Sequence, residues 1–289
     1  MKLILGTVQF GLNYGINNPK GKILKEEVFE ILDYARKHGI NTLDTAHSYG
    51  ESEQVIGEFM QENKANFKII SKFSPDDMGN VELCFQDSLR KLNSNKMYCY
   101  LVHNVKSLIK DPALWLKMID LKERGLVEKI GFSVSNPEDM ECIMKNKVEF
   151  DIIQLPYNVF DQRFADFFPY LRENGVEIHA RSVFLQGLFF KDPSELTGKL
   201  VKIKNKLLSL RQISQEHHLS ISAVCINFTA LNENISKILI GVNSLDNLKE
   251  NIEALKNINQ VKNIRNELLA LREDDADIVF PVNWKQAEN

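Results

Sequence analysis

Residues 44–53 have the sequence Asp44-Thr45-Ala46-His47-Ser48-Tyr49-Gly50-Glu51-Ser52-Glu53, and they follow a short apolar run, residues 41–44, that predicts a β-strand. A carboxylate and a phenol thus lie five residues apart where the strand is predicted to end. The next two apolar runs end in the same way, one at Lys72 and the other at His103. Four ionisable side chains at the ends of three successive runs predict a catalytic site.

Outward from this stretch, short β-rich apolar runs alternate with longer segments of helical period. Eight runs predict strands, and they cover residues 3–5, 41–44, 68–71, 99–103, 129–132, 152–155, 177–180 and 238–241. The segments between them place apolar side chains at the i, i+3, i+4 spacing of a helix that packs on one face. This alternation predicts an α/β protein, a closed (β/α)8 TIM barrel, with an open doubly wound sheet as the alternative.

The chain is predicted to form one domain. Its 289 residues are 44% hydrophobic, which suffices for a large core, and no linker-like segment divides them. Gly39, Gly125 and Gly175 each follow a predicted helix just before the next strand, where a left-handed C-terminal cap favours glycine. We expect a single barrel over residues 1–289, with a C-terminal tail at about 273–289 near the barrel rim.

Charge and composition favour a small-molecule partner. The net charge of −3 comes from 36 basic and 39 acidic residues without long blocks of one sign, which predicts no binding to nucleic acid or to a membrane. The N-terminal apolar run is short for a signal peptide and no stretch approaches the roughly 20 apolar residues of a membrane helix, so a cytoplasmic location is expected. The isolated cysteines predict reduced structural thiols and no metal site: Cys84, Cys99, Cys142 and Cys225.

In a (β/α)8 barrel the active site lies at the carboxyl ends of the strands, so polar residues after the predicted strands should share one rim. Asp44 and Tyr49 follow the second strand, Lys72 the third and His103 the fourth. The later strands add Ser135, Asn136, Gln154, Arg181 and Ser182. Each residue alone has an ordinary explanation as a turn, a cap, a packed aromatic or a solvated charge. Their joint placement favours a functional site.

These residues resemble those of the aldo-keto reductase superfamily, whose members are (β/α)8 barrels that interconvert carbonyls and alcohols with a nicotinamide cofactor. The similarity runs from Leu5-Gly6-Thr7 to about Leu255. No Gly-x-Gly-x-x-Gly follows a strand, so the implied cofactor site is at the barrel rim and not in a Rossmann fold. The resemblance implies that the catalytic residues are Asp44, Tyr49, Lys72 and His103.

The resemblance also implies the contacts to the cofactor. It places the carboxamide of the nicotinamide on Ser135, Asn136 and Gln154, and the adenosine end on residues 241–251. The full set is Thr7, Ser135, Asn136, Gln154, Arg181, Ser182, Phe184, Gln186, Gly241, Asn243, Asn247, Glu250 and Asn251. The expected cofactor is NADPH. NADH is the alternative, since Asn247 stands where NADP-preferring relatives often carry an arginine.

The predicted chemistry explains why these residue types occur together. Hydride transfer to a carbonyl carbon creates an alkoxide that must be protonated as it forms, and Tyr49 is the predicted general acid. A nearby cation favours the ionised form of a phenol, which is the role predicted for Lys72. Asp44 is expected to hold the Lys72 ammonium, and His103 to bond the substrate oxygen.

Arg181 departs from the family pattern. Many relatives have an aromatic residue there that stacks on the nicotinamide, whereas this chain has His179-Ala180-Arg181-Ser182-Val183. A guanidinium can also stack on a ring, or bind a phosphate or carboxylate of the substrate. A structural ion pair with an acidic neighbour is the alternative for Arg181.

The substrate is predicted from less specific features. The loop at 8–19 and the tail at 280–284 mix aromatics with amides, and with His47 and Trp115 they are predicted to wall a pocket for a sugar-like carbonyl; ordinary packing is the alternative for Trp115. Residues 189–204 lack a strand period and are predicted to form a mobile flap. We expect a role in sugar or surface-polysaccharide metabolism, a small-molecule carbonyl as partner, and a monomer or weak homo-oligomer.

Two other functions remain open from the sequence. One is a non-catalytic sensor or auxiliary subunit that binds NADPH on the same fold. The other is a Schiff-base aldolase with Lys72 as nucleophile, which requires a desolvated lysine without a fixed carboxylate partner. The complete set of four ionisable residues argues against the first function, and the expected pairing with Asp44 argues against the second.

Overall fold

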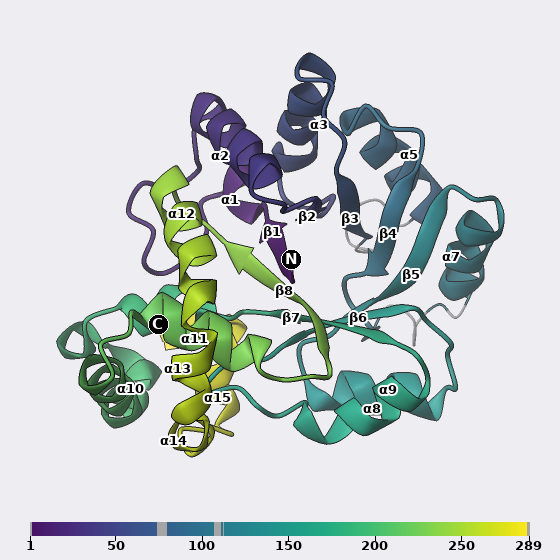
Figure 1. The fold of residues 1–289 in the computed structure, drawn as a ribbon. Helices are drawn as coiled ribbons and strands as arrows, with labels where there is room; N and C mark the ends of the chain where they lie inside the picture. Colours follow the sequence, from purple (N-terminus) through teal and green to yellow (C-terminus); the bar gives the residue numbers. More distant parts are fainter. Residues whose placement is uncertain (1, 74–79, 107–110, 112, 288–289) are drawn as a thin grey trace.

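Eight parallel strands close into a barrel in the computed structural model, which describes residues 2–73, 80–106, 111 and 113–287. Each strand pairs with the next, and the last returns to pair with the first (Figure 1). The strands are β1 Leu3–Gly6, β2 Thr42–Asp44, β3 Lys68–Phe73, β4 Met97–Val102, β5 Val127–Ser133, β6 Ile152–Pro156, β7 Glu177–Arg181 and β8 Ile235–Gly241. The predicted (β/α)8 barrel is confirmed. The alternative prediction of an open sheet is wrong, because β1 and β8 pair with each other and would be unpaired edges in such a sheet.

Helices surround the barrel, as the helical period of the connecting segments predicts (Figure 1). The α-helices are α1 Val8–Gly11, α2 Lys25–Lys37, α3 Ser52–Glu62, α5 Val81–Lys91, α7 Ala113–Glu123, α8 Pro137–Lys145, α9 Phe168–Glu173, α10 Lys204–Glu216, α11 Ile221–Ala230, α12 Leu245–Ala254, α13 Ile258–Asn263, α14 Arg265–Leu269 and α15 Ala276–Val279. The 3-10 helices are η1 Ala165–Phe167, η2 Leu185–Phe190, η3 Pro193–Glu195, η4 Gly198–Ile203, η5 Leu255–Asn257 and η6 Pro281–Ala287.

The turns between helices and strands have the conformation that their glycines predict. Gly39, Gly125 and Gly175 have φ angles of 79°, 70° and 69°, in the left-handed region that disfavours other residues. A Cβ built on any of the three would meet nothing within 4 Å. These positions therefore favour glycine because of the backbone conformation, since a side chain would have room there.

Several strands begin earlier than the apolar runs predict. The strand β5 starts at Val127 and β8 at Ile235, so that both include charged residues at their amino ends. These ends lie on the side of the barrel away from the predicted site, where side chains such as Glu128 and Lys237 are not fully buried. Hydrophobicity therefore locates the carboxyl ends of these strands better than their amino ends.

Two sets of apolar contacts fill the fold. The larger set lies between the strands and the surrounding helices. The smaller set fills the barrel interior and consists of Ile4, Ile70, Cys99, Leu101 and Ile152, all fully buried. Because alternate residues of a strand face the same side, Lys72 and His103 share the interior side with Ile70 and Leu101. The barrel thus directs these two polar side chains towards its central axis.

The cysteines of the chain are free thiols in this structure. Cys84, Cys99 and Cys225 are buried and Cys142 is partly buried, in agreement with the structural role predicted for them. In the described ranges, no helix is both long and apolar enough to cross a membrane. Nor do the described residues include a group of three or more histidine, cysteine, aspartate or glutamate side chains that could hold a metal ion.

Candidate active site

A cavity of about 630 Å³ opens at the carboxyl ends of the strands, a volume typical of small-molecule sites. The predicted site residues that line it are Thr7, Asp44, Tyr49, His103, Ser135, Gln154, Arg181, Ser182, Phe184, Gln186, Gly241, Asn243, Asn247, Glu250 and Asn251. Lys72 is buried below this lining, in contact with Asp44. The fold therefore gathers nearly all of the predicted residues around one space.

A buried ion pair forms part of the cavity floor. Lys72 is 1% exposed, and its Nζ lies 2.5 Å from Oδ1 of Asp44 and 2.8 Å from the carbonyl oxygen of Thr45. Strand pairing makes this contact, since Asp44 lies opposite Ile70, two residues before Lys72. Burial lowers the pKa of Lys72, but the charge on Asp44, the electrostatic interaction with Tyr49 and the hydrogen bond to Asp44 raise it, and together they leave it above its ordinary value. Lys72 therefore keeps its positive charge.

Two rings lie next to this ion pair and line the cavity. The centroid of the Tyr49 ring is 5.1 Å from Nζ of Lys72, and the rings of Tyr49 and His103 meet edge to face with their centroids 6.1 Å apart. Burial, followed by the positive charges of Lys72 and Arg181, lowers the pKa of His103 to about 3. The imidazole is therefore neutral near pH 7.

Gln154 connects the ion pair to the fifth and sixth strands. Its Nε2 donates a hydrogen bond to Oδ2 of Asp44 at 2.7 Å, and its Oε1 accepts one from Oγ of Ser133 at 3.4 Å. Because an ionised carboxylate can only accept, this contact fixes which end of the amide faces Asp44. The Gln154 oxygen has a second lone pair with which to accept a hydrogen bond from a ligand.

Arg181 is held at the cavity wall by three hydrogen bonds. Its Nη2 donates to the carbonyl oxygen of Val134 at 2.8 Å and to Oγ of Ser135 at 2.7 Å, and its Nη1 donates to Oγ of Ser182 at 3.0 Å. In the part of the chain that the structure describes, Arg181 forms no ion pair with a carboxylate. Since Oγ of Ser135 accepts from Arg181, its own hydrogen is left to donate to a ligand.

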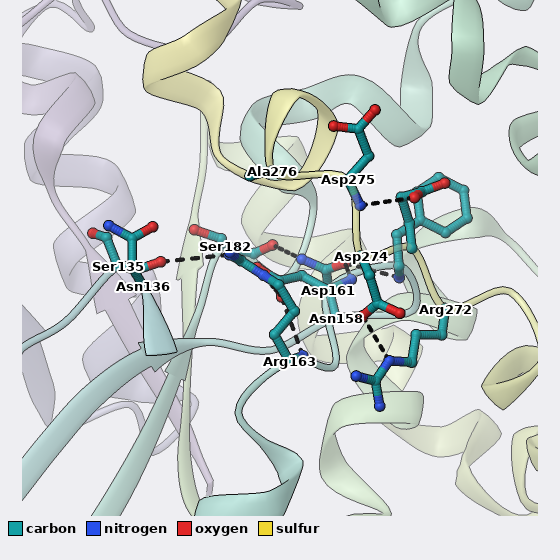
Figure 2. Close-up of polar contacts among 12 residues, drawn as sticks. Ser135, Asn136, Asn158, Asp161, Arg163, Ser182, Arg272, Asp274, Asp275 and Ala276 are labelled. Atoms are coloured by element: carbon teal, nitrogen blue, oxygen red, sulfur yellow. Dashed lines mark hydrogen bonds and ion pairs between the residues drawn. The ribbon is translucent and has the colours of Figure 1, made fainter. Parts of the chain in front are cut away.

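The loop that follows β6 braces the ends of β5 and β7 (Figure 2). Asn158 donates from Nδ2 to the carbonyl oxygen of Ser182 at 2.9 Å, and its Oδ1 accepts the backbone N–H of Asp161 at 2.8 Å. Arg163 donates to both carboxylate oxygens of Asp161 at 2.9 Å and reaches the carbonyl oxygen of Ser135 at 3.4 Å. This network fixes the backbone of the two serines beside the cavity.

Hydroxyl groups hold the segment 44–53 against the barrel. Oγ of Ser52 donates to Oγ1 of Thr7 at 2.8 Å, and Thr7 donates to the carbonyl oxygen of Asp44 at 2.9 Å. Glu53 is buried and accepts from Oγ of Ser71 at 2.6 Å, and burial raises its pKa. The Ser-Glu end of the segment is therefore structural, and it anchors the loop that carries the phenol.

Gly11, the last residue of α1, lets this helix pass directly against the loop that carries Tyr49. A Cβ at Gly11 would lie 1.8 Å from the carbonyl oxygen of Tyr49 and 2.7 Å from the backbone nitrogen of Ser52. The substitution Gly11→Ala must push these backbones apart. We expect it to lower kcat for a carbonyl substrate by about 10²-fold, the loss typical of a misplacement near 1 Å.

The measurement is steady-state turnover together with the thermal midpoint of unfolding. The control is Gly39→Ala, which is strained by its φ of 79° but meets no atom within 4 Å and lies in a turn between α2 and β2. It should lower the midpoint and leave kcat within a few-fold of the parent protein. A Gly11→Ala protein with normal kcat would contradict the role given to this glycine.

Away from the barrel centre, the cavity reaches the first turns of α12. Asn243, Asn247, Glu250 and Asn251 line it there. Gln9 lies beside them, with its Nε2 3.4 Å from Oδ1 of Asn243 and its buried Oε1 without a hydrogen-bond partner among the described residues. A buried acceptor of this kind is available to a ligand that carries a donor.

The C-terminal segment covers one side of the cavity. Lys199 contacts Asp277 at 2.9 Å and Lys202 contacts Asp275 at 3.1 Å, so the segment docks on η4. The residues that follow, 280–282, line the cavity with apolar side chains. The segment predicted to be a flap, 189–204, contains η4, the 3-10 helix that supports this docking. Whether it moves stays a prediction.

Besides Lys72, three of the individually predicted residues lie outside the lining of the cavity. Nε2 of His47 contacts Oδ2 of Asp87 at 3.1 Å, and Trp115 is 7% exposed and stacks on the ring of Phe132 at 4.5 Å. The prediction that His47 walls the pocket is therefore wrong, and Trp115 is a core residue, which confirms the ordinary packing given as its alternative. Asn136 stands at the N-terminus of α8 and is not part of the lining.

The cavity also includes residues that no sequence motif indicated. Ser133 faces it because it lies two residues before Ser135 and shares its side of the extended chain, so strand alternation could have identified it. Leu239 and Ser222 line it as well. Ser222 belongs to α11, where its hydroxyl bonds Oε1 of Glu250 at 2.8 Å, and only the tertiary fold reveals this contact.

A closed barrel with a buried lysine–aspartate pair, a phenol and an imidazole at the carboxyl ends of its strands has the architecture of a barrel enzyme. Residues 2–266 match the aldo/keto reductase family over most of the chain. The chain therefore belongs to the aldo/keto reductase family, and it is an oxidoreductase. Members of this family generally bind nicotinamide cofactors.

Individual relatives are distant. The chain is 27% identical to the probable aryl-alcohol dehydrogenase AAD4 of Saccharomyces cerevisiae, over 81% of this chain and 84% of that protein. It is 22% identical to the L-galactose dehydrogenase of Arabidopsis thaliana, over 90% and 89% of the two chains. The holo form of the aldo-keto reductase AKR11C1 from Bacillus halodurans has a similar fold, with a TM-score of 0.77, 20% identity and coverage of 94% and 92%.

Proposed function

We propose that this protein reduces an aldehyde or ketone to an alcohol with a nicotinamide dinucleotide, and that Tyr49 donates the proton. One observation carries the proposal. The charged Lys72, buried and paired with Asp44 at 2.5 Å, has its Nζ 5.1 Å from the centroid of a tyrosine ring that lines the cavity. A buried cation beside a phenol is an arrangement for proton transfer.

The cavity offers hydrogen-bonding groups that match a nicotinamide carboxamide. Ser135 has a hydroxyl hydrogen to donate, because its oxygen already accepts from Arg181. Gln154 has an oxygen to accept, because its nitrogen already donates to Asp44. A carboxamide needs one donor for its oxygen and one acceptor for its nitrogen. The donor set therefore fits the group, and the dinucleotide, when bound, supplies the hydride.

Each catalytic side chain then has a distinct role. Tyr49 donates its hydroxyl proton to the oxygen of the carbonyl as that oxygen becomes negative. Lys72 stabilises the phenolate that is left, and Asp44 holds the ammonium in position by accepting its hydrogen bond. Arg181 presents a guanidinium fixed by three hydrogen bonds, which can serve as a flat surface for the nicotinamide ring.

His103 acts in this proposal as a neutral hydrogen-bonding group. With its pKa lowered to about 3, the ring does not bind a proton until the pH falls far below 6.5, so its contribution to orienting the substrate oxygen should not change between pH 8 and pH 5. We expect the NMR signal that disappears in His103→Gln to keep its chemical shift over this range. A shift with a midpoint near 6.5 would contradict the neutral role.

The protonation state of Lys72 also helps to decide whether the protein is a Schiff-base aldolase. A Schiff-base lysine must be neutral to attack a carbonyl, and such lysines have a lowered pKa. Here the charge on Asp44, together with the interaction with Tyr49 and the hydrogen bond to Asp44, outweighs burial and raises the pKa of Lys72. This supports proton transfer and argues against a nucleophilic lysine.

For the substrate we propose a small hydroxylated carbonyl, because the cavity combines aromatic side chains with amides. Tyr14 and Phe190 contribute rings, and Asn17 and Gln186 contribute amides. Hydroxyl-rich rings use both kinds of contact. The names of the relatives give two classes to compare, a sugar for one and aryl alcohols for the other. The resemblance alone implies NADPH with NADH as the alternative, and the charges on the outer wall of the cavity bear on which of the two is bound.

The experiment is to follow oxidation of NADH and NADPH with a panel of sugar aldehydes and aromatic aldehydes. The proposal expects turnover with at least one carbonyl and a higher kcat/KM for hydroxylated substrates. Turnover confined to aromatic aldehydes would overturn the substrate class only. If both cofactors bind but no carbonyl is reduced, the protein is better described as a nicotinamide-binding sensor.

A further inference from the structure

We infer that the cavity excludes the 2′-phosphate of NADPH and that NADH is the physiological cofactor, with Glu27 as a residue that sets this preference. The inference rests on the proposed function and concerns the outer wall of the same cavity. It follows from the charges on that wall, from the contact between α2 and α12, and from the position that the reacting end of the dinucleotide must take near Tyr49.

The position of the adenosine end follows from the cavity itself. The end of the dinucleotide that reacts must lie near Tyr49, over the barrel centre, so the other end must extend to the outer wall. One part of that wall is apolar and consists of Phe190 and residues 280–282. The other part is polar and is formed by the start of α12, which lies outside the barrel beside α2 (Figure 1). A ribose with its hydroxyl or phosphate groups belongs on the polar part.

This polar wall contains no side chain that would neutralise a phosphate. Among the described residues that line the cavity, Arg181 is the only lysine or arginine. Its guanidinium is hydrogen-bonded to Ser135 at the other end of the cavity. The wall itself presents the neutral amides of Asn243 and Asn247 and the carboxylate of Glu250. A phosphate monoester carries about −1.5 to −2 charges at pH 7, and an unpaired charge of that size is costly to place beside a carboxylate.

The nearest lysine on α12 is already paired with a carboxylate. Nζ of Lys249 lies 3.0 Å from Oδ1 of Asp246, and the hydrogen bond to Asp246 is the main reason that its pKa is raised. Both side chains are exposed, so the pair itself is weak. It still leaves no net positive charge at this end of α12 to attract a 2′-phosphate.

Glu27 adds a negative charge at the start of α12. Its Oε1 accepts the backbone N–H of Leu245, the first residue of that helix, at 3.2 Å. The Ser244 side chain accepts the N–H of Asn247 at 3.2 Å. The free N–H groups at the start of a helix are the usual binding site for an anion, and here the chain supplies its own acceptors. A phosphate approaching this helix end would meet an occupied donor and the Glu27 carboxylate. This is specificity by repulsion.

The test is the dissociation constant of each cofactor for the full-length protein, measured by fluorescence titration with NADH and NADPH at low and high KCl. We expect NADH to bind about tenfold more tightly than NADPH or better, and the difference to narrow as salt screens the repulsion. Glu27→Gln keeps the hydrogen-bond acceptor but removes the charge, so it should tighten NADPH binding several-fold and leave NADH binding within about twofold.

The matched control is Glu26→Gln, an exposed glutamate next to Glu27 in the first turn of α2, which should change neither dissociation constant. Asn243→Lys provides a second variant should Glu27→Gln fold poorly, and it should also improve NADPH binding selectively. Equal or tighter binding of NADPH by the unmodified protein would overturn the inference and leave the proposed reductase activity standing. Absence of binding by both cofactors would instead overturn the proposed function.

Discussion

Substitution of Tyr49 by phenylalanine is expected to lower kcat by about 10²–10⁴-fold, the range attributed to a general acid. The hydroxyl is the group proposed to give its proton to the substrate oxygen, and no other part of the ring takes part in that step. The phenyl ring should still fill the space beside His103, where the two ring centroids are 6.1 Å apart. The dissociation constants of both nicotinamide cofactors should therefore change little.

A second phenol in the same cavity provides the control. Burial, with the charge on Tyr49 as the next cause, raises the pKa of Tyr14, which makes it a poorer proton donor than an unperturbed tyrosine. Tyr14→Phe should lower kcat by less than about tenfold, because Tyr14 is not the group proposed to donate the proton. Comparable losses in the two variants, or normal turnover in Tyr49→Phe, would show that the proton comes from another group.

Removal of the Asp44 carboxylate is expected to have the largest effect on stability. Asp44→Ala leaves the ammonium of Lys72 buried without its ion-pair partner, and breaking a buried pair in this way costs about 3–5 kcal/mol. The free energy of unfolding, measured by urea denaturation, should fall by that amount. The decrease in the free energy of unfolding should exceed that caused by loss of a simple apolar contact. The reason is that the Gln154 amide also loses the carboxylate to which it donates at 2.7 Å.

Two controls separate the ion pair from general damage to the barrel. The double variant Asp44→Leu with Lys72→Met replaces both charges by apolar groups and should regain much of the lost stability, since matched apolar replacements of buried pairs are often neutral. Glu253→Ala removes an exposed partner of Lys256, 2.7 Å away, and should change stability by less than about 1 kcal/mol. An Asp44→Ala protein as stable as the parent would mean that Lys72 is not charged.

The positions of Asp44, Lys72 and His103 could be predicted from the sequence because each follows a short apolar run. In a barrel of parallel strands, the carboxyl ends of all runs meet at one rim, so position along the chain determines position in space. The same reasoning accounts for Gln154 and Arg181. The sequence does not indicate what Ser52 and Glu53 do. In the structure their hydrogen bonds anchor the loop that carries Tyr49.

The features that could not be predicted depend on contacts between distant segments. Gly11 allows the end of α1 to lie directly against the backbone of the loop that carries Tyr49. The hydrogen bond from Gln154 to Asp44 joins residues 110 positions apart. The contact of Glu27 with Leu245 spans 218 positions. Composition and periodicity describe which face of an element is buried, and they do not specify which side chain lies opposite.

The central claim is that the ammonium of Lys72 and the phenol of Tyr49 act as one unit in proton transfer. The most direct test is a double-mutant cycle of kcat with Tyr49→Phe, Lys72→Met and the combined variant, each shown to fold and to bind cofactor. Substitutions of groups that act as a unit have strongly non-additive effects on kcat. The combined variant should therefore be no slower than the slower single variant, within about threefold. Losses that multiply in the combined variant would contradict the claim.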